Sequence, residues 1–196
     1  MSDRLIKALE DVRDLPHITL GKIVEHVEGE ALLILSLISI LPFMQPIPIP
    51  GLSSVLGLIV LLQGLGLMFW SKPLLTKRMK NLNITHERFE YIYKAALKFS
   101  AFTSKISAFK HPLTNTRGSH IICGFAIILS SAFLSLPLPI PFSNLIPALS
   151  IFLICVGLLE EDLILILMGL GITVSVIWMA MFSYHIITEQ FQNYLL

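Results

Sequence analysis

The chain has little charge for its length. Only 14% of its 196 residues are charged, whereas 55% are hydrophobic and the mean hydropathy is +0.79. Soluble domains carry roughly one quarter charged residues, so the composition excludes an ordinary soluble protein and indicates an integral membrane protein. A cleavable signal peptide is also missing, because residues 1–14 mix both signs of charge where an apolar region would stand. We expect the first hydrophobic segment to act as the targeting signal.

Sequence motifs for catalysis and metal binding are missing as well. The chain has no P-loop, no dinucleotide fingerprint, no nucleophile elbow and no helix with paired histidines. Its two cysteines, Cys123 and Cys155, lie in apolar runs without metal-ligand spacing and are interpreted as small buried hydrophobes. We therefore expect no enzyme activity, no cofactor and no metal, with a membrane acid–base site of Glu and His as the alternative. Nucleic-acid binding is not indicated.

Positive charge is absent from the last part of the chain. All 14 Lys and Arg residues precede Ile121, and ten of them lie between Lys72 and Arg117. Because cationic segments are retained in the cytoplasm during insertion, the N-terminal region and the middle segment are predicted to be cytoplasmic. The C-terminal tail from Tyr184 is predicted on the opposite face.

A proline-punctuated apolar hairpin occurs twice. A shift of 91 positions superposes the two sets of prolines and also places Gly66-Leu67 on Gly157-Leu158. Internal repeats that flank helix breaks are typical of transporters, although the prolines could simply turn two helical hairpins. Because both repeats start from the cytoplasm, we expect parallel repeats whose proline turns approach each other inside the bilayer. The prolines are Pro46, Pro48, Pro50, Pro137, Pro139 and Pro141.

Segment lengths then predict an all-α polytopic membrane protein that forms a single domain. Repeat one covers about 19–70, a cytoplasmic interfacial segment 71–117, repeat two about 118–162, and a last transmembrane helix 163–184. The limbs 52–70 and 163–182 are long enough to cross the hydrocarbon core. The limbs 31–43, 121–136 and 145–159 are shorter, and are predicted to be re-entrant or thinly spanning.

The middle segment carries an amphipathic helix. Thr85 is its predicted N-cap, apolar residues follow from Phe89 at three- and four-residue spacing, and Lys94, Lys98 and Lys105 take another face. This pattern predicts an interfacial helix on anionic lipid headgroups, with packing against a soluble partner as the alternative. Residues 3–15 form a shorter version, and Thr19 is the predicted cap of the next helix.

Carboxylates are the main candidates for chemistry. The strongest is Glu160-Glu161-Asp162, which stands between two apolar runs with no cation nearby in sequence. Snorkelling to water is the simple interpretation; on a helix, however, three consecutive residues point in three directions. We expect one of Glu160 and Asp162 to face a cavity and the other headgroup water. The hypothetical substrate or ion pathway comprises Glu30, Ser53, Arg117, Asn144, Glu160 and Asp162.

Glycines in the apolar runs are expected to permit close helix packing. Small residues let membrane helices approach each other, which is a simpler interpretation of these glycines than phosphate binding. The residues are Gly57, Gly64, Gly66, Gly169 and Gly171.

Several of these motifs also carry a family resemblance. Pro48-Ile49-Pro50-Gly51-Leu52-Ser53, the segment from Pro139 to Ala148, and the segment from Gly157 to Asp162 closely resemble the ExoD-like membrane proteins, named for exopolysaccharide synthesis. The resemblance covers about Thr19 to Met179. Leu163 departs from it, since family members usually have Gly directly after the acidic Glu-x-Asp. The resemblance implies a multi-pass protein of the bacterial inner membrane connected with envelope polysaccharide, and it implies no established biochemical activity.

Two functions compete at this point. The first, which is the leading hypothesis, is transport or translocation of an envelope precursor or an anionic lipid-linked substrate across the inner membrane. The second is a non-transporting scaffold or regulator of a polysaccharide-synthesis complex, which would use the basic interfacial helix for docking. A transporter needs a polar cavity that reaches the proline turns, whereas a scaffold can be solidly packed there. Homo-oligomerisation is open in both.

Overall fold

The described chain is built of helices. The computed structural model describes residues 2–13, 18–27, 30–44, 52–69, 81, 83–107, 109–136 and 144–195. The predicted all-α class is confirmed, and the six prolines of the two turns lie outside the described residues. In chain order the elements are α1 (Ser2–Arg13), α2 (Leu20–Val27), α3 (Glu30–Ile40), the 3-10 helix η1 (Leu41–Met44), α4 (Leu52–Phe69), α6 (His86–Ile106), the 3-10 helix η2 (Pro112–Asn115), α7 (Arg117–Leu134), α8 (Leu145–Glu160) and α9 (Leu163–Leu195).

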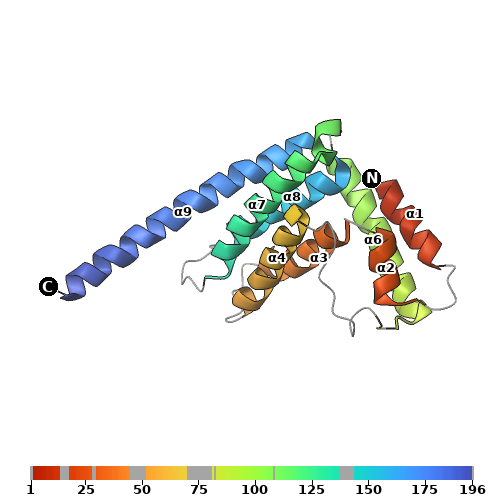
Figure 1. The fold of residues 1–196 in the computed structure, drawn as a ribbon, viewed down its shortest axis with the longest axis horizontal. Helices are drawn as coiled ribbons and strands as arrows, with labels where there is room; N and C mark the ends of the chain where they lie inside the picture. Colours follow the sequence, from red (N-terminus) through yellow and green to blue (C-terminus); the bar gives the residue numbers. More distant parts are fainter. Residues whose placement is uncertain are drawn as a thin grey trace.

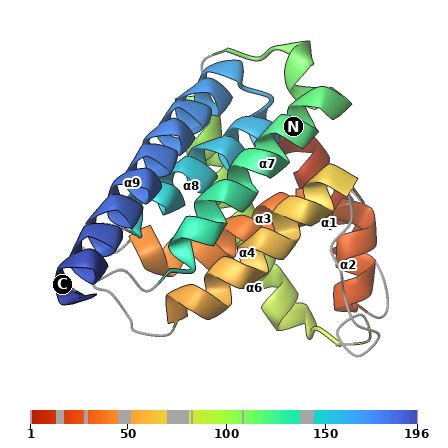
Figure 2. The same cartoon turned by 60° about the vertical axis from the view of Figure 1, so that its left-hand side comes forward.

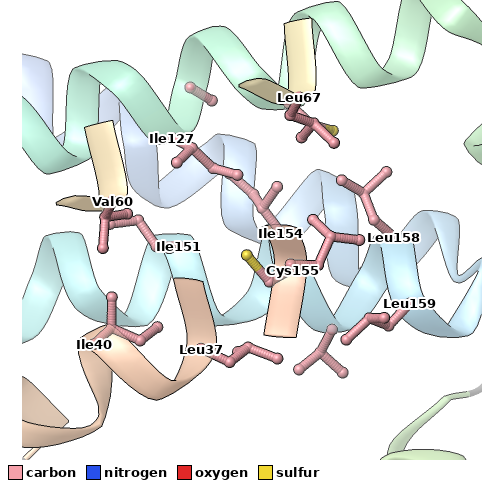
Figure 3. Close-up of a cluster of buried hydrophobic side chains, with 14 of the residues drawn as sticks. Leu37, Ile40, Val60, Leu67, Ile127, Ile151, Ile154, Cys155, Leu158 and Leu159 are labelled. Carbon is pink, nitrogen blue, oxygen red and sulfur yellow. The ribbon is translucent and has the colours of Figure 1, made fainter. Parts of the chain in front are cut away.

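The helices form a bundle and a smaller layer at one end of it. Figure 1 shows α3, α4, α7, α8 and α9 packed side by side, with α1, α2 and α6 gathered at the end where α8 meets α9. The centre of the bundle is apolar. Figure 3 shows Ile40, Val60, Ile127, Ile151 and Ile154 pointing toward one another from four helices, and all five side chains are buried.

Close helix packing depends on glycines in two helix pairs. A Cβ atom on Gly64 of α4 would lie 3.1 Å from the carbonyl oxygen of Gly124 in α7, and one on Gly169 of α9 would lie 3.0 Å from the backbone nitrogen of Ile154 in α8. Figure 2 shows α4 and α7 running side by side in opposite directions. Gly171 is different, because nothing lies within 4 Å of its Cβ position. The packing role predicted for Gly171 is therefore wrong.

The outside of the bundle is also apolar. On α9 the side chains of Val174 and Trp178 are 66% and 70% exposed. Exposed apolar area costs free energy in water, and large apolar patches mark contact with lipid or with other proteins. Two helical stretches, Arg117–Leu134 and Leu163–Met181, are long and apolar enough to cross a bilayer. Together these features indicate a membrane protein. Other exposed apolar residues are Ile38, Leu41, Val55, Leu58, Leu62, Ile122, Phe125, Leu167 and Met181.

Two helices are longer than their sequence patterns suggest. The limb 121–136 was expected to be too short, but α7 begins at Arg117 and its 18 residues pass the length criterion for a span. The final helix was expected to end at residue 184, but α9 has 33 residues and is about 50 Å long. Both helices therefore continue into polar residues outside the apolar segments from which their lengths were predicted.

The end layer packs on its own small core. Phe89 of α6 is fully buried beside residues of α1 and α2. Tyr93 donates a hydrogen bond to Glu10 of α1 at 2.9 Å, and this bond raises the pKa of Tyr93. Arg13 forms an ion pair with Glu90 at 2.6 Å. One face of α6 is thus covered by protein, so any lipid contact must use another face.

The predicted helix starts in this layer are correct in position. Thr85 is the N-cap residue of α6, although its side chain makes no capping hydrogen bond. Thr19 precedes α2, and its Oγ1 accepts a hydrogen bond from the backbone N–H of Lys22 at 3.4 Å. The N–H of Ile84 donates to the carbonyl of Ile18 at 2.9 Å, which ties the start of α2 to the start of α6.

Two glycines of α9 test the packing directly. Gly169→Ala should lower the free energy of unfolding by about 1–3 kcal/mol, because the new methyl group would press on the backbone of α8. Gly171→Ala is the matched control, and it should be neutral or slightly stabilising, because its methyl group meets open space. The measurement is thermal unfolding of both purified variants in one detergent. Equal melting temperatures would contradict the helix pairing.

Candidate functional site

The candidate site is the corner at which α8 ends and α9 begins. Glu161 has φ 57° and ψ 31°, the left-handed conformation that commonly ends a helix. The N–H of Asp162 donates to the carbonyl of Gly157 at 2.8 Å, and that of Glu161 donates to Leu158 at 3.4 Å. This pair of bonds is a Schellman motif. It reverses the chain, so that α9 returns along α8.

Asp162 starts the next helix. Its Oδ1 accepts hydrogen bonds from the backbone N–H groups of Ile164 at 2.8 Å and Leu165 at 3.2 Å. These are the second and third residues of α9, so Asp162 is an N-cap. The helix dipole favours a negative charge at this position. The carboxylate therefore satisfies two backbone donors that would otherwise be buried without partners.

The other oxygen of Asp162 holds the segment that follows α6. Oδ2 accepts hydrogen bonds from the backbone N–H of Phe109 at 2.9 Å and from the hydroxyl of Ser107 at 3.1 Å. The side chain is fully buried. Four donors from the described residues point at it, and a protonated carboxyl would bring another donor to the same space. We infer that Asp162 is ionised in the folded protein.

Glu160 makes a parallel contact with Thr103, which stands one helical turn before Ser107. Its Oε1 accepts a hydrogen bond from the hydroxyl of Thr103 at 2.5 Å, and both side chains are buried. The backbone adds two bonds, from the N–H of His111 to the carbonyl of Glu161 at 3.0 Å and from the N–H of Leu163 to that of Phe109 at 3.2 Å. We call this set of contacts the corner clasp: Thr103, Ser107, Phe109, His111 and residues 160–163.

The clasp corrects the interpretation of the acidic triplet. Residues 160–162 are not the consecutive helical positions that the sequence predicts, because α8 ends at Glu160 and Asp162 stands outside both helices. Neither carboxylate meets water, since Glu160 is 3% and Asp162 0% exposed. The expectation that one of them contacts headgroup water is wrong. An acidic residue directly before an apolar helix is an N-cap signal, and that signal was overlooked.

The remaining pathway residues stand at the starts of four helices. Asn144 precedes the first residue of α8, one helix length of about 24 Å from Glu160, and its side chain makes no capping hydrogen bond. Arg117 opens α7 with an exposed side chain, and Glu30 opens α3 half-buried. Ser53 lies in the first turn of α4, and its side chain is outside the described residues. Asn144 and the two clasp carboxylates therefore lie at opposite ends of α8.

A second set of polar groups lies inside the bundle. The hydroxyl of Ser150 in α8 lies 2.7 Å from that of Thr173 in α9 and donates to the carbonyl of Gly169 at 2.9 Å. In α3 and α4, the hydroxyl of Ser36 lies 2.7 Å from Oε1 of Gln63. All five residues are buried. Such bonds join helices in lipid, and these hold neighbouring helices together.

The described residues offer no metal site. No group of three or more His, Cys, Asp or Glu side chains that could hold a metal ion occurs within the described ranges. The clasp itself consists of acceptors that are already matched by hydroxyl and backbone donors. Its geometry supports a mechanical connection between the end layer and the bundle.

Replacement of Asp162 tests that connection. Asp162→Asn keeps the shape of the side chain but replaces one carboxylate oxygen with an NH₂ group. In the wild type both oxygens accept hydrogen bonds from backbone N–H groups, so in the variant one of these donors would face another donor. The loss should be about 2–4 kcal/mol of unfolding free energy, the range for a buried charged group that loses its partners. Thermal unfolding of the purified protein measures it. Asp11→Asn on the exposed side of α1 is the control, and equal stability of the two variants would contradict the clasp.

Replacement of Glu161 by glycine should raise the stability of the protein, whereas replacement of Asp162 should lower it. Glu161→Gly should stabilise the protein by up to about 1 kcal/mol, because glycine adopts the left-handed conformation without a Cβ penalty. Glu161→Val should destabilise it, because β-branched residues are strained there. The same unfolding measurement applies. A glycine variant less stable than the valine variant would rule out this helix end.

Comparison with known proteins agrees with the sequence motifs. The family model described as "Exopolysaccharide synthesis, ExoD" matches residues 2–183. Protein ExoD of Rhizobium meliloti (strain 1021) is 29% identical over 167 residues, which cover 83% of this chain and 68% of that protein. The uncharacterized protein slr1875 of Synechocystis is 33% identical over 143 residues, 70% of this chain and 63% of that protein. No solved structure gives a significant match. With nearly its whole length matched, the chain belongs to the ExoD family.

Proposed function

We propose that this protein is a multi-pass protein of the bacterial inner membrane that serves exopolysaccharide synthesis as a non-transporting scaffold or regulator. Its family and its relative from Rhizobium link it to exopolysaccharide synthesis. The exposed apolar side chains on α3, α4, α7 and α9 provide a lipid-facing surface. The cationic segments support a cytoplasmic position for the end layer of α1, α2 and α6.

The bundle is proposed to be two parallel repeats. Under the shift of 91, the end of α4 at Phe69 falls on the end of α8 at Glu160. In this arrangement α3 corresponds to α7, and α4 corresponds to α8. A twofold axis that relates the repeats would therefore pair the contact between α3 and α8 with a contact between α7 and α4, and both contacts are present. The residues that flank the two proline turns also meet, since the hydroxyl of Ser54 donates to the carbonyl of Ser135 at 3.1 Å. These features support a pseudo-twofold axis along the bundle.

One observation carries the choice of a non-transporting role. Large apolar side chains fill the described centre of the bundle. Ile40 and Leu134 are fully buried at the ends of α3 and α7 that lead toward the proline turns, and Val60 and Ile151 are fully buried further along α4 and α8. A transport path would need polar groups exposed to a cavity there. The two carboxylates that a path would use are instead engaged in the corner clasp.

Transport is the second candidate, and the repeat arrangement favours it. Parallel repeats about an axis along the membrane normal occur in transporters, which move one repeat against the other. In such a mechanism the contact between α4 and α7, one helix from each repeat, has to change.

A cross-link between the repeats separates the two candidates. Ser54→Cys combined with Ser135→Cys joins α4 to α7 at the end proposed to lie in the oxidising periplasm. A deletion strain carrying this pair should keep exopolysaccharide production within about twofold of the wild type. The fraction of cross-linked protein is read from non-reducing gels of the same cultures.

The control is Ser54→Cys alone, which cannot form the link. Loss of polymer in the cross-linked strain, restored by a reductant and absent from the single variant, would contradict the scaffold and establish movement between the repeats. Unchanged polymer in a fully cross-linked population supports the non-transporting role.

A further inference from the structure

One face of α6 is basic and is left uncovered by the protein. From Lys94 to Lys110 the sequence contains four lysines and no acidic residue. Lys94, Lys98 and Lys105 are exposed. Lys98 is nine residues after the fully buried Phe89, which is two and a half helical turns, so the two residues take opposite sides of α6. The packing of α1 on α6 therefore leaves the lysines free to face outward.

An aromatic side chain accompanies the lysines. Phe102 is 55% exposed, although Thr103 beside it is fully buried in the corner clasp. Exposure of a large aromatic residue next to lysines is typical of helices that lie in the membrane interface, where the ring enters the acyl boundary and the ammonium groups stay among headgroups. We call Lys94, Lys98, Phe102 and Lys105 the lysine face.

The carboxylates nearest to this face are mostly engaged elsewhere. Glu90 pairs with Arg13, Glu10 accepts from Tyr93, and Glu160 accepts from Thr103. Glu87 is exposed, and it stands in the first turn of α6, two helical turns before Lys94. The central and C-terminal parts of the helix therefore present positive charge that no acidic residue of the same stretch balances.

The lysine face leads along the chain into the apolar surface of the bundle. Phe109 and Leu113 are 49% and 56% exposed and follow α6 directly. Next comes α7, one of the two span-length helices, with exposed Ile122 and Phe125. The C-terminal end of α6 is thus fixed at the level where α7 and α9 begin, which is the cytoplasmic boundary of the proposed membrane span.

We propose that the lysine face of α6 docks on anionic phospholipid headgroups of the membrane that holds the bundle. Positive charge, an exposed phenylalanine and continuity with the apolar surface all match a negatively charged bilayer surface. This inference rests on the membrane placement in the proposed function. It makes α6 a membrane contact, so the surface left for other synthesis components lies elsewhere in the end layer.

The test is lysine acetylation of the full-length protein in nanodiscs. One set contains phosphatidylcholine only, and the other contains 30% phosphatidylglycerol. Acetylation of Lys98 and Lys105, read by mass spectrometry, should slow about fivefold in the anionic discs, the factor that corresponds to one lysine's attraction to an anionic surface. Exposed Lys7 of α1 is the internal control and should change less than twofold. High salt should remove the difference.

A variant with reversed charge on the lysine face tests the proposal in a second way. In Lys98→Glu combined with Lys105→Glu, acetylation of Lys94 should become equal in both discs, whereas Lys7→Glu should leave the protection of Lys94 unchanged. Equal rates at Lys98 and Lys105 in both discs would overturn the proposal, as would protection that appears only after an acidic cytoplasmic protein is added. Failure of the protein to enter the discs would instead contradict the membrane placement. The role in synthesis is read separately, from polymer made in cells.

Discussion

The buried carboxylate of Asp162 is the interaction on which the arrangement of this protein depends. It caps α9, holds the segment after α6, and lies next to the left-handed residue that ends α8. A charge in so dry a place is costly unless donors surround it. Four donors do so here, and they come from two segments more than fifty residues apart in the sequence. Because the buried carboxylate is stable only with these donors, the segment after α6 and the start of α9 must both lie beside it in the folded protein.

The packing of the bundle has the features expected of a protein in lipid. Apolar side chains lie both inside and outside it, so hydrophobic burial cannot distinguish one helix face from another as it does in water. Contact is selected instead by glycines, which let backbones approach, and by hydroxyl groups that pair across helices. Gly169 and Thr173 supply both features to one face of α9, and the opposite face carries bulky side chains such as Trp178.

The class of the fold could be predicted from composition and period, because long apolar runs broken by prolines have few structural solutions. The helix of the middle segment and its start at Thr85 followed from amphipathic spacing. The clasp could not be predicted in the same way. Thr103 and Ser107 are ordinary residues of a polar helix end, and only the folded chain brings them to Glu160 and Asp162. The sequence alone also could not distinguish Gly169 from Gly171, since which glycine meets a neighbour depends on the rotation of α9.

The position of Asp162 in the chain also sets an order of events during synthesis. Its partners Ser107 and Phe109 leave the ribosome before it does, and they have no carboxylate to bind until both hairpins have been made. Closure of this contact spans more than fifty residues and therefore bears a large loop entropy. The contact that joins the end layer to the bundle is therefore completed only when the residue directly before the last helix has been made.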